Sequence, residues 1–186
     1  MKKYRLILTI STLVFSVVAV AATHGRRAME RDLNLFGPAT EGLQAVGFKP
    51  RGKVTVLARQ DVQGTDRLRV EVEGLPENVC FTVFLAEQND FPFGSLQYVA
   101  EVCTDHSGKG SVTANLVVVD AFALKTEANA SPPPVFATPI NVDLNHIVLW
   151  FSDSADDDGF TSLGAGPFDA DRDSGVAVLR TSEPLP

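Results

Sequence analysis

Two cysteines, Cys80 and Cys103, lie in strand-like segments that are separated by a short loop. Residues 79–87 and 96–104 are rich in β-branched and aromatic side chains, and residues 88–95 contain the Asn, Asp, Pro and Gly of a turn. A hairpin closed by this loop places Cys80 directly opposite Cys103. A shift of the pairing by one residue would mix apolar and polar side chains on the apolar face of the hairpin, so the register is well specified. The other expected pairs are Phe81/Val102, Thr82/Glu101, Val83/Ala100, Phe84/Val99, Leu85/Tyr98 and Ala86/Gln97.

The N-terminal segment has the pattern of a signal peptide. Three basic residues, Lys2, Lys3 and Arg5, precede an uncharged apolar run over residues 6–22. The small residues Ala19 and Ala21 fit the pockets of signal peptidase, which predicts cleavage after Ala21 or Ala22. The alternative is an uncleaved membrane anchor over residues 1–22, because the apolar run is about as long as the shortest spanning helix.

Export favours a structural disulfide between the two cysteines, because an oxidising compartment stabilises such bonds. The alternative is a redox-active or metal-binding pair. The spacing is not C-x-x-C, and no histidine lies beside either cysteine, so we expect the disulfide.

The mature chain is acidic. Cleavage removes three of the 16 basic residues and none of the 23 acidic ones, which leaves a net charge of −10. Such a surface repels phosphate backbones and anionic headgroups. We therefore expect no nucleic-acid partner, and membrane contact only through an uncleaved N-terminal segment. An unknown protein or glycan partner remains open.

The strand pattern begins near residue 51. Residues 67–73 alternate apolar and charged side chains, which is typical of a strand with one wet face. With the hairpin, and with further strands expected over residues 53–59, 110–120, 146–152 and 175–181, about seven strands result. The pattern predicts an all-β fold, an antiparallel immunoglobulin-like β-sandwich over residues 51–186. Residues 23–50 contain scattered Gly and Pro without periodicity, and we expect a flexible tether there.

Two aspartate-rich stretches lie between the last two predicted strands: residues 153–159 directly follow the strand of residues 146–152, and residues 169–175 directly precede the last one. Alternating carboxylates in a tight loop can converge on one hard cation, and this favours a calcium site. Solvated loops are the alternative, because neither stretch matches an EF-hand. The expected ligands are Asp156, Asp158, Asp169, Asp171 and Asp173.

The hairpin loop carries a second candidate site. Phe91 and Phe93 flank Pro92 at its tip, where rings have little room to be buried. We expect both rings to be exposed and to form a contact surface. The residues Asp105, His106 and Ser107 carry the letters of a catalytic triad, but consecutive residues cannot adopt its geometry, so a turn is expected there.

Several segments resemble secreted bacterial β-proteins of unassigned function. The matching residues are a Leu75-Pro76 turn followed by the strand Phe81–Leu85, then Pro92–Val99, His146–Phe151 and Pro167–Asp169. The chain is also similar to the extracytoplasmic sandwich of some anti-sigma factors. The resemblance implies a β-sandwich outside the cytoplasm and supplies no activity.

No catalytic motif emerges from the sequence, so we expect a protein that is not an enzyme. The leading hypothesis is a secreted or cell-envelope module that acts by binding or structural contact. The alternatives are a calcium-assisted hydrolase that uses the Asp loops, and an extracytoplasmic sensor domain held by an uncleaved anchor.

Overall fold

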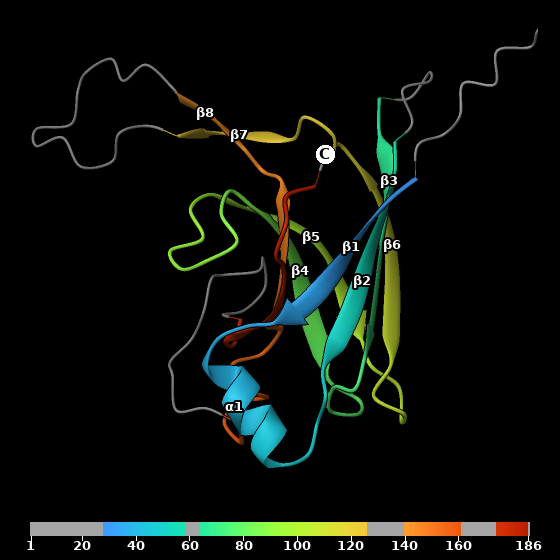
Figure 1. Ribbon diagram of the computed structural model, residues 1–186, viewed down its shortest axis with the longest axis vertical. Coiled ribbons are helices and arrows are strands. Elements are labelled where there is room, and N and C mark those ends of the chain that lie inside the picture. The colour runs from blue at the N-terminus through green and yellow to red at the C-terminus, as the bar shows by residue number, and fades with distance from the viewer. Residues whose placement is uncertain (1–27, 59–63, 126–139, 161–173, 186) are drawn as a thin grey trace, which may run out of the picture.

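The computed structural model describes residues 28–58, 64–125, 140–160 and 174–185. Within them lie one helix and ten strands (Figure 1). Their bounds, in chain order, are β1 (Ala28–Leu35), α1 (Pro38–Ala45), β2 (Arg51–Leu57), β3 (Asp66–Glu73), β4 (Cys80–Ala86), β5 (Leu96–Cys103), β6 (Gly110–Leu116), β7 (Phe122–Lys125), β8 (Ile140–Asp143), β9 (His146–Phe151) and β10 (Ala177–Thr181).

Eight strands form one antiparallel sheet in the order β5-β4-β9-β10-β1-β2-β3-β6. The sheet curls so far that its two terminal strands, β5 and β6, meet at the turn that joins them, and it is nearly closed. Strands β7 and β8 pair separately and project from one end (Figure 1).

The main core fills the inside of the curled sheet. Strand β3 shows the origin of this arrangement, since Leu68, Val70 and Val72 are buried and the charged residues between them are exposed. Side chains on a strand point alternately to opposite faces, so this alternation buries one face and solvates the other. The inward side chains of β4 and β9 join the same core.

The all-β, antiparallel class is confirmed, and each of the seven expected strands is present. Eight of the ten described strands form one nearly closed sheet and β7 pairs only with β8, so the two facing sheets of the predicted immunoglobulin-like sandwich are not seen among the described residues. The pattern of the sequence identifies strands, but the partner of each strand depends on contacts between distant segments.

The prediction of a flexible tether is wrong for residues 28–50. Strand β1 lies inside the sheet, between β10 and β2, and Leu33 on it is almost fully buried. Helix α1 begins at Pro38, which suits a first helical position because proline has no N–H to leave unpaired. A Cβ atom at Gly42 would collide with the backbone of Phe160, so the helix packs closely on the segment after β9.

The register of the β4–β5 hairpin is confirmed over its first half. Cys80 to Val83 oppose Cys103 to Ala100 as expected. A bulge then shifts the pairing, so that Phe84 opposes Tyr98, Leu85 opposes Gln97 and Ala86 opposes Leu96. The three predicted pairs beyond Val83 are therefore wrong by one residue, because a bulge adds one unpaired residue to one strand.

Across the described ranges, no helix has the length and apolarity needed to span a membrane. The predicted signal peptide or anchor lies outside these ranges.

Candidate functional site

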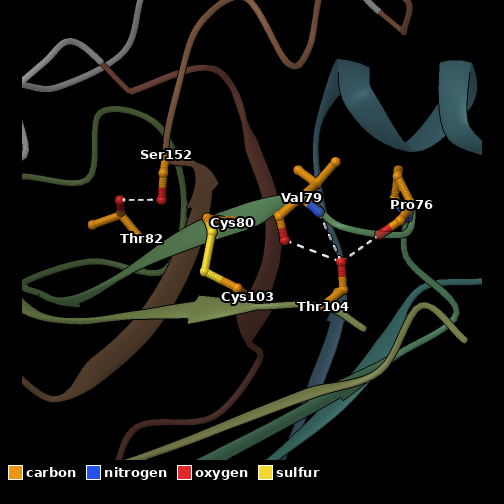
Figure 2. The surroundings of a disulfide bond; sticks show 7 residues. All are labelled: Pro76, Val79, Cys80, Thr82, Cys103, Thr104 and Ser152. Atoms are coloured by element: carbon orange, nitrogen blue, oxygen red, sulfur yellow. Dashed lines mark hydrogen bonds between the residues drawn. A yellow bond between two sulfur atoms is a disulfide. The ribbon is translucent and has the colours of Figure 1, made fainter. Parts of the chain in front are cut away.

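The predicted disulfide is present at the base of the β4–β5 hairpin. The Cys80 and Cys103 sulfur atoms are 1.98 Å apart and join directly opposed residues of the two strands (Figure 2). Glu101 lies close to both sulfur atoms, but bonded sulfurs are not thiolate ligands, so this trio is a poor metal site. The covalent bond fixes the end of the hairpin farthest from its loop.

Three buried hydroxyl groups lie near the disulfide (Figure 2). The Thr104 hydroxyl donates to the Pro76 carbonyl oxygen at 2.6 Å, and accepts from the Val79 N–H at 3.1 Å. The hydroxyls of Thr82 and Ser152 are 2.9 Å apart and join β4 to the end of β9. Buried polar groups stabilise a fold when they are satisfied in this way.

The two phenylalanines of the loop between β4 and β5, residues 87–95, differ in their exposure to solvent. Phe91 is 82% exposed, whereas Phe93 is only 8% exposed. The Phe93 ring packs edge-on against Trp150 and Phe36, with centroid distances of 4.9 and 5.2 Å. The expectation of two exposed rings is therefore wrong for Phe93, because the loop folds back onto an apolar face of the sheet.

Backbone hydrogen bonds close the ends of this loop. The Glu87 N–H donates to Ser95 O and the Gln88 N–H to Phe93 O, both at 3.0 Å. The Glu87 side chain accepts from the Ser95 N–H at 2.9 Å. Gly94 has a φ of 74°, and a Cβ atom there would collide with the Glu87 carboxylate. The conformation of the loop thus requires glycine at this position.

Arg180 on β10 holds the outer part of the loop. Its guanidinium group donates to the Asn89 carbonyl oxygen and lies 3.4 Å from the Asp90 carboxylate. The same group stacks over the Phe36 ring, 4.5 Å from its centre, a favourable cation–π distance. Asn89 also donates from its side chain to Ser182 O at 2.9 Å. The loop is therefore tied to β10 and to the segment after it.

Five aromatic rings run in sequence across the outer face of the sheet, and we call them the aromatic series. Successive centroid distances are 6.4, 4.9, 5.0 and 6.3 Å, within the usual range for edge-to-face pairs. Its two ends are exposed, 82% for Phe91 and 47% for Tyr98, and its middle is buried. The members, in spatial order, are Phe91, Phe93, Trp150, Phe84 and Tyr98.

The chain was compared with protein-family models, with curated proteins and with solved structures. None of these comparisons gives a match. The resemblance to secreted bacterial β-proteins therefore stays a prediction. The candidate site is supported by the arrangement of the described residues.

The acidic stretch after β9 is arranged differently from the predicted alternation. Asp156 and Asp158 are exposed, whereas Asp157 between them is buried with 1% exposure. One Asp157 carboxylate oxygen accepts from the Val176 N–H at 2.6 Å. Burial, together with the charges of Asp158 and Asp156, raises the pKa of this carboxyl group. No feature of the sequence distinguishes the middle aspartate from its neighbours.

The other predicted ligands, Asp169, Asp171 and Asp173, lie outside the described residues. Within the described ranges, no three carboxylates of the stretch after β9 converge on one point. The calcium site therefore stays a prediction. Asp157, which that prediction omitted, accepts a hydrogen bond from Val176, the residue directly before β10.

A groove of about 740 Å³ crosses the charged outer face of β2 and β3. Its carboxylates and cations neutralise one another: Arg51 lies 2.5 Å from Glu73, and Lys109 lies 3.7 Å from it. The hydrogen bond and charge of Arg51 lower the pKa of Glu73. These pairs are exposed, and such pairs are typical of a solvated face.

The Asp105-His106-Ser107 sequence forms the turn that was expected. The Asp105 carboxylate accepts from the Ser107 N–H and hydroxyl, both at 2.7 Å, and from the Lys109 N–H at 3.2 Å. These hydrogen bonds lower the pKa of Asp105. His106 is exposed on the turn, so the carboxylate serves the backbone of the turn.

Proposed function

We propose that this chain is an exported, non-catalytic binding module that recognises a protein or glycan partner through the loop of residues 87–95. The observation that carries the proposal is the contrast within that loop. Phe91 is the most exposed large apolar side chain in the described residues, and the backbone beneath it is held at both ends and in the middle. A ring presented by a fixed loop loses little conformational entropy when it binds.

The disulfide supports the exported part of the proposal, because such bonds persist outside the reducing cytosol. The proposed cleavage sites, after Ala21 or Ala22, precede the first residue of β1, Ala28. Cleavage there leaves every described strand intact. N-terminal sequencing of the protein isolated from its native host tests this step, and a sequence that still begins at Met1 would contradict it.

The binding part is tested with glycan and peptide arrays probed by three proteins. These are the wild type, Phe91→Ala and Phe122→Ala, the last a control because Phe122 is 57% exposed on β7. If Phe91 is a central contact, its loss weakens binding by about 2 kcal/mol, or about 30-fold. We expect the control to retain the wild-type pattern.

Equal array patterns for all three proteins would exclude the loop as the binding surface. A loss of stability would not explain weaker binding by Phe91→Ala. The Phe91 ring is largely exposed, so we expect the variant to keep the wild-type fold.

A further inference from the structure

His146 begins strand β9 at the end of the sheet where the loop of residues 87–95 starts. It directly opposes Ala86, the last residue of β4, so the loop begins at the residue next to this pair. Ala86 is buried in the apolar cluster of the outer face, together with Trp150. Directly opposed residues of two paired strands point to the same face, so His146 also lies on the outer face, beside the start of the loop.

The surroundings of the His146 ring favour its neutral form. The side chain is half-buried, and its Nδ1 atom is buried without a hydrogen-bond partner among the described residues. Both ring nitrogens of the charged form carry a proton, so protonation leaves a buried N–H group without an acceptor. Burial, followed by the positive charge of Arg180, lowers the pKa of His146 below the usual 6.5.

Arg180 connects this histidine to the loop. It opposes Val148, two residues after His146 on β9, so the side chains of Arg180 and His146 lie on the same face. The guanidinium group binds the Asn89 carbonyl oxygen and lies 3.4 Å from the Asp90 carboxylate. A positive charge on His146 repels this group and favours conformations in which Arg180 moves away. Such a movement breaks both contacts with the loop.

The carboxylates near this end of the sheet do not stabilise a charged His146. They belong to Glu87 and Asp90 of the loop, Asp143 of β8 and Glu183 of the segment after β10. Glu87 accepts from a loop N–H, and Asp90 and Glu183 each pair with an arginine. Asp143 is exposed. Of the charged groups in the described residues, only Arg180 acts on the pKa of His146.

We propose that His146 is a pH switch for the loop: in mildly acidic solution its protonation repels Arg180 and releases residues 87–95 from the outer face. The released conformation exposes the ring to water and separates the two charges, so it binds a proton more readily than the closed conformation. Acid therefore shifts the population toward the released conformation. Phe91 moves with the loop, so acid should also weaken the binding proposed above. That consequence alone rests on the proposed function.

Reciprocal linkage provides the first test. If protonation of His146 releases the loop, loosening the loop must favour protonation by the same free energy. Phe93→Ala removes the ring that packs on Trp150, whereas Phe91→Ala removes its exposed neighbour. NMR titration of the imidazole ring should give a pKa below 6.5 in the wild type and in Phe91→Ala, and a higher value, nearer 6.5, in Phe93→Ala. The loss of the signal in His146→Gln assigns it.

Hydrogen exchange of the Trp150 indole N–H provides the second test, because Trp150 is the only tryptophan and packs against the Phe93 ring. Between pH 7.5 and 5.5 its opening, corrected for the pH dependence of the unprotected rate, should rise in the wild type by at most about tenfold, the limit for one proton. It should not rise in His146→Gln, whose side chain stays neutral. His106→Gln is the matched control, because His106 is exposed on its turn, and it should behave like the wild type.

Three results would overturn the proposal. One is a His146 pKa that is equal in the wild type and in Phe93→Ala; if Phe93→Ala does not fold, the exchange experiment decides. Another is equal acid-induced opening in the wild type and in His146→Gln. The third is an equal rise in exchange of the β3 amides, since His146 would then act on the whole fold and not on the loop. Neither test involves a partner, so a failure of the proposed binding leaves both results unaffected.

Discussion

The two halves of the sheet share an inner face but differ on the outer one. On β2 and β3 the outward side chains are mostly charged, and they form exposed ion pairs such as Lys53–Glu30 at 3.2 Å and Arg69–Glu71 at 2.8 Å. On β4 and β9 the outward residues Phe84 and Trp150 are buried in a second apolar cluster. One half is therefore solvated, and the other is covered by the loop of residues 87–95.

The difference shows how the same alternation produces two kinds of surface. The inward residues of both halves build one core, as any half-buried sheet does. The outward residues decide whether a loop can pack on the sheet. Aromatic side chains offer a loop a large apolar area, whereas paired charges are best left in water. The proposed binding loop is thus a consequence of the apolar outer face.

The largest expected effect comes from removing the centre of the apolar outer face. Trp150 contacts both Phe84 and Phe93 and is almost fully buried, so Trp150→Ala should lower the free energy of unfolding by about 3–5 kcal/mol. The control on the charged face, Arg69→Ala, should change it by less than about 0.5 kcal/mol. Urea unfolding measures both. Similar values for the two variants would mean that the faces do not differ energetically.

The next largest effect concerns the disulfide at the base of the β4–β5 hairpin. Replacing Cys80 and Cys103 by alanine should lower the free energy of unfolding by about 3 kcal/mol, because the loop closed by the bond gains entropy in the unfolded chain. The same denaturant series measures this loss, with reduced wild-type protein as the comparison. A double variant as stable as the oxidised wild type would show that the hydrogen bonds of Thr104 are sufficient to hold the hairpin base.

These comparisons also show how far the sequence predicts the fold. The alternation of β3 and the opposed cysteines predict local strands and one register, because both depend on neighbouring residues. Strand β1 was missed because Glu30, Arg31 and Asp32 are consecutive charges that conceal the alternation. Its place between β10 and β2 depends on contacts between segments far apart in the chain.

The candidate site was predicted only in part. The exposure of Phe91 agrees with its position at a loop tip, where few neighbours are available. The burial of Phe93 depends on Trp150 and Phe36, which are distant in the sequence, and Phe36 belongs to the segment assigned to the tether. Nothing local to the loop indicates that one ring turns inward. A bulge in β5 likewise leaves no trace in the sequence pattern.

The smallest expected effect concerns a carboxylate that resembles those of the charged face in sequence but not in surroundings. Asp157 is buried, and burial raises its pKa above the usual 3.8. A raised pKa in the folded state favours the protonated form there. The resulting stabilisation is complete below the unfolded pKa, and it is lost as the pH rises through the folded value.

Asp157→Asn is neutral at every pH and still offers an oxygen to the Val176 N–H, so it should lack this pH dependence. We therefore expect the melting temperature of the variant, relative to wild type, to rise as the pH increases from about 4 through the raised pKa, and then to level off. Thermal unfolding of both proteins between pH 3 and 8 measures the difference. Glu71→Gln is the matched control, because it makes the same kind of replacement at an exposed position of β3, and we expect it to change the relative melting temperature less. If the relative melting temperature of Asp157→Asn instead fell over this range, the ionised carboxylate would be stabilised in the fold. The contrast between a buried carboxylate and the solvated carboxylates of the charged face would then not hold.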